Sequence, residues 1–227
     1  MKYLLTGILG FLVGAAAAMA ALYFNPLTDG AGPLPAEGDS TYSYASPVTS
    51  ELVFTHGGLS RLPSSPSEVP YLWEATINKT ALSVLVLKGA DGSASGVASR
   101  VSYPDEDTEL LATGALLNDD WTVSFPGQGS LFVTARSNWW PLLKEAVIPV
   151  WYLGQLWPGP EVYTPTVGPG PDGRAVVRGA SGRFAGQTGS AAERYQIEEF
   201  DDRLGPRQVH AELYWRFDER LPETAAD

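Results

Sequence analysis

After residue 50 the chain consists mainly of short runs in which apolar and polar residues alternate, and this pattern most limits its fold. The clearest run spans residues 209–217, where every second residue is apolar. A period of two puts successive side chains on opposite faces of a β-strand. Further strand-like runs occur at 81–87, 97–103, 121–125 and 192–200. We therefore expect about eight short strands here and no helix longer than about ten residues.

The turns between these runs are rich in glycine and proline, with 24 glycines and 18 prolines in the 227-residue chain. Many short strands joined by tight turns favour an antiparallel sheet, and closing that sheet removes its exposed edges. We predict a mainly β fold, an antiparallel closed β-barrel over residues 51–218. Residues 25–50 have the composition of a linker, and 219–227 that of a solvated tail.

The first 24 residues form a separate unit, because residues 3–24 carry no charge. As a helix they would span about 33 Å, enough to cross a ~30 Å hydrocarbon core. A transmembrane anchor and a signal peptide cleaved after Ala18-Met19-Ala20 both agree with this segment. Lys2 precedes it and the next basic residue is Arg61. The positive-inside rule then predicts a single-pass bacterial inner-membrane protein with its C-terminal domain in the periplasm, or a secreted one after cleavage.

Charge and composition exclude several functions. The net charge is −11, and no basic cluster is present to bind a nucleic-acid backbone. The chain has no cysteine and only two histidines. Thiolate catalysis, disulfides and cysteine-based or three-histidine metal sites are therefore impossible. We expect no cofactor and no metal, and self-association is left open.

Four regularly spaced glycines flank an aromatic residue near the C-terminus: Gly179, Gly182, Phe184, Gly186 and Gly189. This glycine-rich stretch and the strand after it, residues 179–200, resemble the hairpin of allene oxide cyclase and dirigent-like barrels. The resemblance implies an eight-stranded barrel around an apolar pocket that acts by its shape. The catalytic residues of those families lie outside the matched hairpin, so the resemblance assigns none here.

Residues 138–157 contain four of the seven tryptophans and are the strongest candidate for a ligand-binding element. Three interpretations apply: core packing under a lid, the mouth of an apolar pocket, or contact with the bilayer surface. A short helix is expected over 142–148, between two prolines. The candidate ligand-binding residues are Trp139, Trp140, Trp151, Tyr152, Trp157 and the hairpin residue Phe184.

The only weak catalytic candidates are His210 and Glu212, which lie two residues apart on the polar face of the last strand. A carboxylate on the same face could orient the imidazole as a general base. A solvent-exposed histidine is the more ordinary interpretation of this position.

Taken together, these features predict a membrane-tethered periplasmic β-barrel that binds a hydrophobic or amphiphilic small molecule, lipids included, without catalysis. One alternative is a cyclase or isomerase that acts through an apolar barrel cavity. Another is an envelope scaffold that binds other proteins. A buried carboxylate or tyrosine inside the cavity would favour the enzyme.

Overall fold

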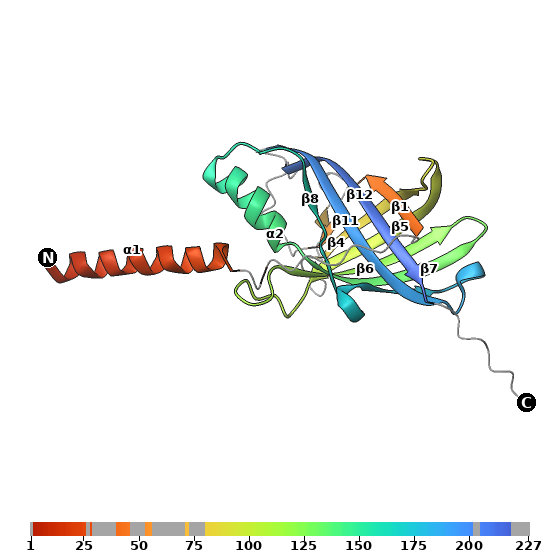
Figure 1. Cartoon of the computed structure of the whole chain (residues 1–227), viewed down its shortest axis with the longest axis horizontal. Helices are drawn as coiled ribbons and strands as arrows, with labels where there is room; N and C mark the ends of the chain where they lie inside the picture. The colour runs from red at the N-terminus through yellow and green to blue at the C-terminus, as the bar shows by residue number, and fades with distance from the viewer. Residues whose placement is uncertain are drawn as a thin grey trace, which may run out of the picture.

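Strands of the C-terminal region close into a barrel, and a long helix leaves one end of it (Figure 1). The computed structural model describes residues 2–25, 28, 40–45, 53–55, 71–72, 80–201 and 205–218. Its helices are α1 (Lys2–Tyr23), α2 (Trp140–Leu142), η3 (Leu143–Tyr152), η4 (Pro171–Gly173) and η5 (Gly182–Phe184). Its strands are β1 (Ser40–Ala45), β2 (Val53–Thr55), β3 (Tyr71–Leu72), β4 (Thr80–Lys88), β5 (Ala94–Pro104), β6 (Leu116–Phe125), β7 (Gly129–Asn138), β8 (Glu161–Tyr163), β9 (Thr166–Gly168), β10 (Ala175–Gly179), β11 (Thr188–Asp201) and β12 (Gly205–Phe217).

The barrel contains eight antiparallel strands in the order β1-β12-β11-β10-β7-β6-β5-β4, and β1 and β4 close the circle. Four short strands lie outside this circle: β2 extends β4, β3 extends β2, and β8 and β9 pair with β11 and β7. The predicted closed barrel is therefore confirmed. The alternation explains it, because along β6 the residues Trp121, Val123 and Phe125 are buried and those between them are exposed.

Strand β1 differs from the expectation, because residues 40–45 lie inside the segment assigned to a linker. This part of the linker prediction is wrong: the six residues pair with β12 over their whole length. Inward-facing Tyr42 stacks on Trp215 at 4.6 Å between ring centroids, and Tyr44 lies edge-on to Trp121. Two tyrosines in alternation thus bury enough aromatic surface to order a segment of polar composition.

The helix between β7 and β8 is longer than predicted. It begins at Trp140 and continues through Pro149 to Tyr152, mostly as a π-helix. Pro149 has no amide hydrogen to donate, which had suggested a stop there. Burial of Pro149, Ala146 and Val150 against the rest of the molecule outweighs this lost hydrogen bond. We call this unit, residues 140–152, the α2–η3 helix.

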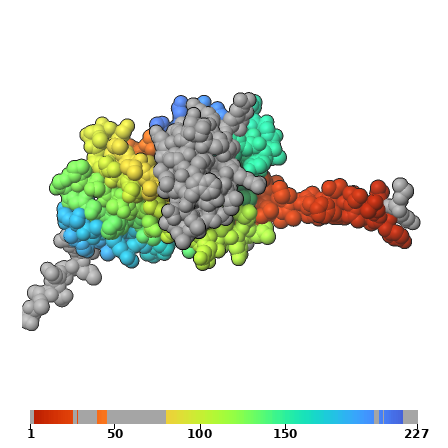
Figure 2. Space-filling view, turned by 180° about the vertical axis from the view of Figure 1, so that it is seen from behind, coloured from red at the N-terminus to blue at the C-terminus, as the bar shows by residue number. Residues whose placement is uncertain are grey.

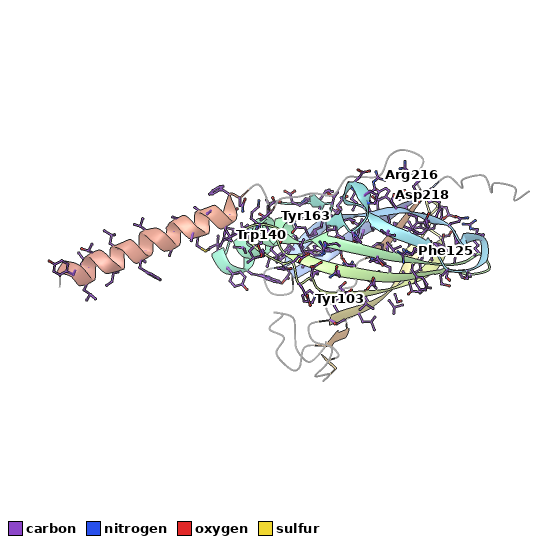
Figure 3. The ribbon with its side chains drawn as sticks, turned by 90° about the horizontal axis from the view of Figure 1, so that it is seen from below. Tyr103, Phe125, Trp140, Tyr163, Arg216 and Asp218 are labelled. Atoms are coloured by element: carbon purple, nitrogen blue, oxygen red, sulfur yellow. The ribbon has the colours of Figure 1, made fainter. Side chains whose placement is uncertain are left out.

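The barrel interior is divided along its axis. Aromatic side chains fill the end near the β6–β7 turn, where Phe125 contacts Tyr42, Phe184 and Trp215 at 5.1–5.5 Å between ring centroids. Figure 3 shows Phe125 at this end and Trp140 and Tyr163 at the opposite end, near α1. Between the two ends lies a layer of charged and polar side chains.

Candidate functional site

A buried ion-pair network crosses the middle of the barrel. Arg100 on β5 donates from Nε to Asp119 on β6 at 2.9 Å and from a terminal guanidinium nitrogen to Glu193 on β11 at 3.2 Å. All three residues are buried, and Asp119 is completely so. The guanidinium also lies over the Trp121 ring, 5.0 Å from its centroid. One cation therefore faces two carboxyl groups in a site with little water.

Hydroxyl groups satisfy much of the remaining hydrogen-bonding capacity of these carboxyl groups. Ser102 and Ser137 donate to the two oxygens of Asp119, and Tyr44 donates to Glu193. The backbone amide of Glu193 in turn donates to the Thr166 hydroxyl at 2.9 Å. The network thus joins β1, β5, β6, β7, β9 and β11 and fixes their relative positions.

The charges in this network are unequal. Burial opposes the charge of Arg100, but Asp119 and the nearby Tyr195 outweigh that effect and raise the pKa of Arg100. Burial raises the pKa of Glu193 to about 8. At neutral pH Glu193 is therefore mostly protonated, while Asp119 balances the guanidinium charge. A protonated carboxylic acid beside an arginine can donate a hydrogen bond or a proton.

The alternation of the strands contains a signal for two carboxyl groups of this network. Asp119 is in step with Trp121, Val123 and Phe125, and Glu193 is in step with Tyr195 and Ile197. A charged residue on the apolar face of a strand must point inward. Which of these residues meet across the barrel follows only from strand order and register.

A pocket of about 230 Å³ lies at the barrel end that carries the α2–η3 helix. It is bounded by the end of β7, the start of this helix and strand β8. We call it the mouth pocket. Its lining residues are Asn138, Trp139, Pro141, Leu142, Glu145, Val162, Tyr163, Thr164 and Pro165.

Two residues that line the mouth pocket each carry a polar atom with no hydrogen-bond partner among the described residues: the indole nitrogen of Trp139 and the hydroxyl of Tyr163. Both atoms are buried. Burial, together with the carboxylates of Glu145 and Glu161, raises the pKa of Tyr163, so its hydroxyl keeps its proton. Buried donors without partners are costly. Both donors belong to residues that line the mouth pocket.

Tyr195 lies between the mouth pocket and the ion-pair network. Its ring packs edge-on against Trp139 at 5.1 Å between centroids, and its backbone pairs with that of Tyr163 across β11 and β8. On its other side it contributes to the raised pKa of Arg100. The Tyr195 side chain thus lies between the mouth pocket and the ion-pair network.

The structure separates the tryptophans that were predicted together as ligand-binding residues. Trp139 lines the mouth pocket, whereas Trp140 is buried behind it. Trp151 and Trp157 both pack on Phe200, at 5.4 and 5.6 Å between centroids. Exposed Tyr152 contributes to neither group. The core and pocket interpretations therefore each describe part of this segment, and a ligand role for these residues remains a prediction.

Phe184 and the hairpin glycines lie at the opposite end of the barrel from the mouth pocket. Phe184 is buried against Phe125 and Phe217. A side chain at Gly179 would collide with the Phe184 carbonyl, and one at Gly189 with the Arg216 carbonyl. Their close backbone approaches show a structural reason for glycine, and a ligand role for Phe184 remains a prediction.

His210 and Glu212 lie on the outer wall of the barrel, beside a second pocket of about 230 Å³ that also involves Arg194. His210 is exposed. Glu212 accepts hydrogen bonds from Tyr214 and, at 3.0 Å, from Arg194, and these lower its pKa. The carboxylate thus has other partners on the wall. Over the described residues, no group of three or more His, Asp or Glu side chains could hold a metal ion.

Comparison with known proteins gives only distant similarities. No family model matches the chain, and no curated protein matches it. One solved structure is of a nonspecific heme-binding cyclase that catalyses a 4 + 2 cycloaddition in neoabyssomicin biosynthesis. It is 8% identical, with a TM-score of 0.43 over 83% of this chain and 69% of that one. The Diels–Alderase AbmU from Streptomyces koyangensis is 10% identical, with a TM-score of 0.39 over 79% of this chain and 62% of its own.

Neither neighbour is described as an allene oxide cyclase or a dirigent protein, although both are described by cyclisation chemistry. Because no family model matches the chain, the resemblance carried by residues 179–200 remains a prediction.

Proposed function

We propose that the barrel binds a small amphiphilic molecule in the mouth pocket and does not transform it. The observation that supports this proposal is the pair of unpartnered buried donors on Trp139 and Tyr163. Leu142, Val162 and two prolines supply apolar walls around them. Apolar walls with a few convergent polar groups are the usual composition of a ligand site.

The size and charge of the pocket narrow the ligand class. A volume of about 230 Å³ is below the ~300 Å³ at the low end for drug-sized ligands, so the pocket holds one end of a larger molecule. The nearby carboxylates of Glu145 and Glu161 repel an anionic group. We therefore infer a neutral oxygen acceptor, such as a carbonyl, ester or ether, attached to an apolar chain or ring.

A pair of valine substitutions tests this function. Val162→Trp places an indole at the pocket wall, whereas Val84→Trp adds the same side chain to the outer wall of β4, where Val84 is exposed. Full-length protein is extracted from membranes in polymer-bounded nanodiscs, and copurified small molecules are identified by mass spectrometry. We expect a molecule with a neutral oxygen group in the wild type and in Val84→Trp, but not in Val162→Trp.

Equal recovery of the same compounds from all three proteins would show that none of them occupies the mouth pocket. Recovery of no compound enriched over bulk lipid in any of the three would also contradict the proposal. Tyr163→Phe provides a finer check, because it removes one donor and keeps the ring. It should weaken retention without abolishing it.

An enzyme of the cyclase or isomerase type is the second candidate, and the protonated Glu193 beside Arg100 favours it. Such a group can protonate a substrate at neutral pH. Incubating the copurified compound with wild type and with Glu193→Gln would test this function. A product formed only by the wild type supports the enzyme, and an unchanged compound with both proteins supports the binding module.

A further inference from the structure

Five large apolar side chains are exposed at one end of the molecule and come from two separate segments. Leu110 and Leu111 belong to the loop between β5 and β6. Tyr152, Leu153 and Leu156 lie at and after the end of the α2–η3 helix, where Leu156 is 93% exposed. We call these five residues the end surface. Leucines exposed in two segments at one end of a molecule indicate a contact surface, because water disfavours a gathered apolar area.

The same end of the barrel holds the C-terminal end of α1. The Asn25 side chain donates to the Leu111 carbonyl, and the Asn138 side chain donates to the Thr28 carbonyl at 2.7 Å. Thr28 is completely buried. Asn138 also lines the mouth pocket. Asn25 and Thr28, which follow α1, therefore lie beside the end surface and the mouth pocket, respectively.

All three views agree on this arrangement. In Figure 1 the α2–η3 helix and the β5–β6 loop lie on either side of the point where α1 leaves the barrel, and β12 ends at the other end. Figure 2 shows α1 as a free rod beyond that end. Tyr3–Tyr23 of α1 is long and apolar enough to span a membrane, and none of its most apolar window is buried. A membrane entered by α1 would therefore meet the end surface.

The charges around the end surface are mostly acidic. Glu106, Asp107 and Glu109 are exposed on the same loop as the two leucines. The neighbouring cation Arg136 is paired with Asp105 at 2.7 Å and with Asp107 at 3.2 Å. Attraction to anionic headgroups is therefore weak, and burial of apolar side chains must supply the contact energy.

We propose that the end surface rests in the headgroup region of the bilayer that α1 enters. Tyr152 and the leucines insert at the level where amphipathic and apolar side chains of interfacial helices bind. The barrel is thereby held with the mouth pocket against the membrane. If the proposed function is also correct, an amphiphile can pass between bilayer and pocket without crossing water.

Single-cysteine labelling tests this contact, because the native chain has no cysteine. Leu111→Cys, Leu156→Cys and the control Ala185→Cys are each labelled with an environment-sensitive fluorophore. Ala185 is exposed next to Phe184 at the opposite end of the barrel. A fourth variant, Leu12→Cys, reports insertion of α1. The full-length proteins are reconstituted into phosphatidylcholine vesicles, some of which carry lipids with a nitroxide near the headgroup end of the acyl chain.

We expect the labels at 111 and 156 to lose most of their emission to the nitroxide lipids and to be protected from aqueous iodide. The label at 185 should show the reverse. Raising the salt concentration should leave the lipid quenching unchanged, because the contact is apolar. The proposal is overturned if iodide quenches the labels at 111 and 156 as strongly as the label at 185, whatever the label at 12 shows. The pocket variant Val162→Trp tests the proposed function separately, since it leaves the end surface intact.

Discussion

The protonation state of Glu193 sets the charge balance of the barrel interior. Arg100 can neutralise one carboxylate, and Asp119 already meets it through a hydrogen bond at 2.9 Å. An ionised Glu193 would add a second negative charge in a completely enclosed layer. Keeping the proton on Glu193 avoids this desolvation cost.

This charge balance predicts a pH-dependent stability. The folded protein holds the Glu193 proton up to about pH 8, whereas the unfolded chain releases it near 4.5. The folded state therefore binds the extra proton between these values, and this group lowers stability as the pH rises through that window. The full loss is on the order of 5 kcal/mol, at about 1.4 kcal/mol for each pH unit of that window. Thermal unfolding of full-length protein in nanodiscs, followed by tryptophan fluorescence from pH 5 to pH 9, measures it.

Glu193→Gln supplies the comparison, since an amide keeps the oxygen that accepts from Tyr44 and Arg100. The variant should unfold at a nearly constant temperature across that pH range. Between pH 5 and 8 the unfolding temperature of the wild type should lie below that of the variant, and the difference should shrink as the pH falls. If wild type and variant showed parallel pH profiles, Glu193 would not be the titrating group.

At the scale of elements, the β10–β11 hairpin depends on close backbone approach. Gly182 and Gly186 both have positive φ, +61° and +72°. A Cβ at Gly182 would lie 2.2 Å from the Gln128 carbonyl oxygen, whereas one at Gly186 would meet nothing within 4 Å. Both positions need a residue that tolerates positive φ, but only Gly182 also lacks room for a side chain. Comparing the two positions therefore separates these two reasons for glycine.

Alanine substitution should therefore give unequal losses. Gly186→Ala should cost about 1 kcal/mol, the penalty of a left-handed conformation. Gly182→Ala should cost about 2–4 kcal/mol, because the β6–β7 turn must also move away. Thermal unfolding of the two variants in nanodiscs measures both changes. Equal destabilisation would mean that the contact between the hairpin and the β6–β7 turn contributes little.

The strands themselves were largely predictable, and the elements that were missed share one physical cause. Strand-like runs in the sequence located β4, β5, β6, β11 and β12, most clearly through the alternation in β6 and β12. The linker-like composition of residues 40–45 concealed β1, whose stability comes from pairing with β12 and from aromatic partners distant in sequence. Likewise, Pro149 predicts the end of a helix, whereas the α2–η3 helix continues through it to Tyr152. Tertiary contacts outweighed local preference in both elements.

At the scale of the whole molecule, the position of Lys2 before α1 predicts one orientation of the protein across the membrane. If the positive-inside rule applies, the N-terminus with Lys2 stays in the cytoplasm and the barrel lies outside. Alkaline phosphatase fused after Asp227 should then be active, and a fluorescent protein folded only in the cytoplasm should remain dark there. A fluorescent fusion and an inactive phosphatase would reverse the orientation. Retention of the chain in membranes after an alkaline carbonate wash would distinguish an uncleaved anchor from a cleaved signal.

The sequence alone determined the fold class and the presence of an apolar N-terminal helix, because periodicity and uninterrupted hydrophobicity are local properties of a chain. It also contained the inward direction of Asp119 and Glu193, because both are in step with buried apolar residues of their own strands. The inward direction of Arg100 was not predictable in this way, because Arg100 is in step with small residues while Val97 of the same strand is exposed. Only the tertiary structure decided that these three residues meet, that the mouth pocket lies beside the end of α1, and that Phe184 lies far from it. Strand order, register and closure bring together residues that are far apart in the sequence, such as Tyr44 and Glu193, which are 149 positions apart. No local pattern specifies which distant strands will be neighbours.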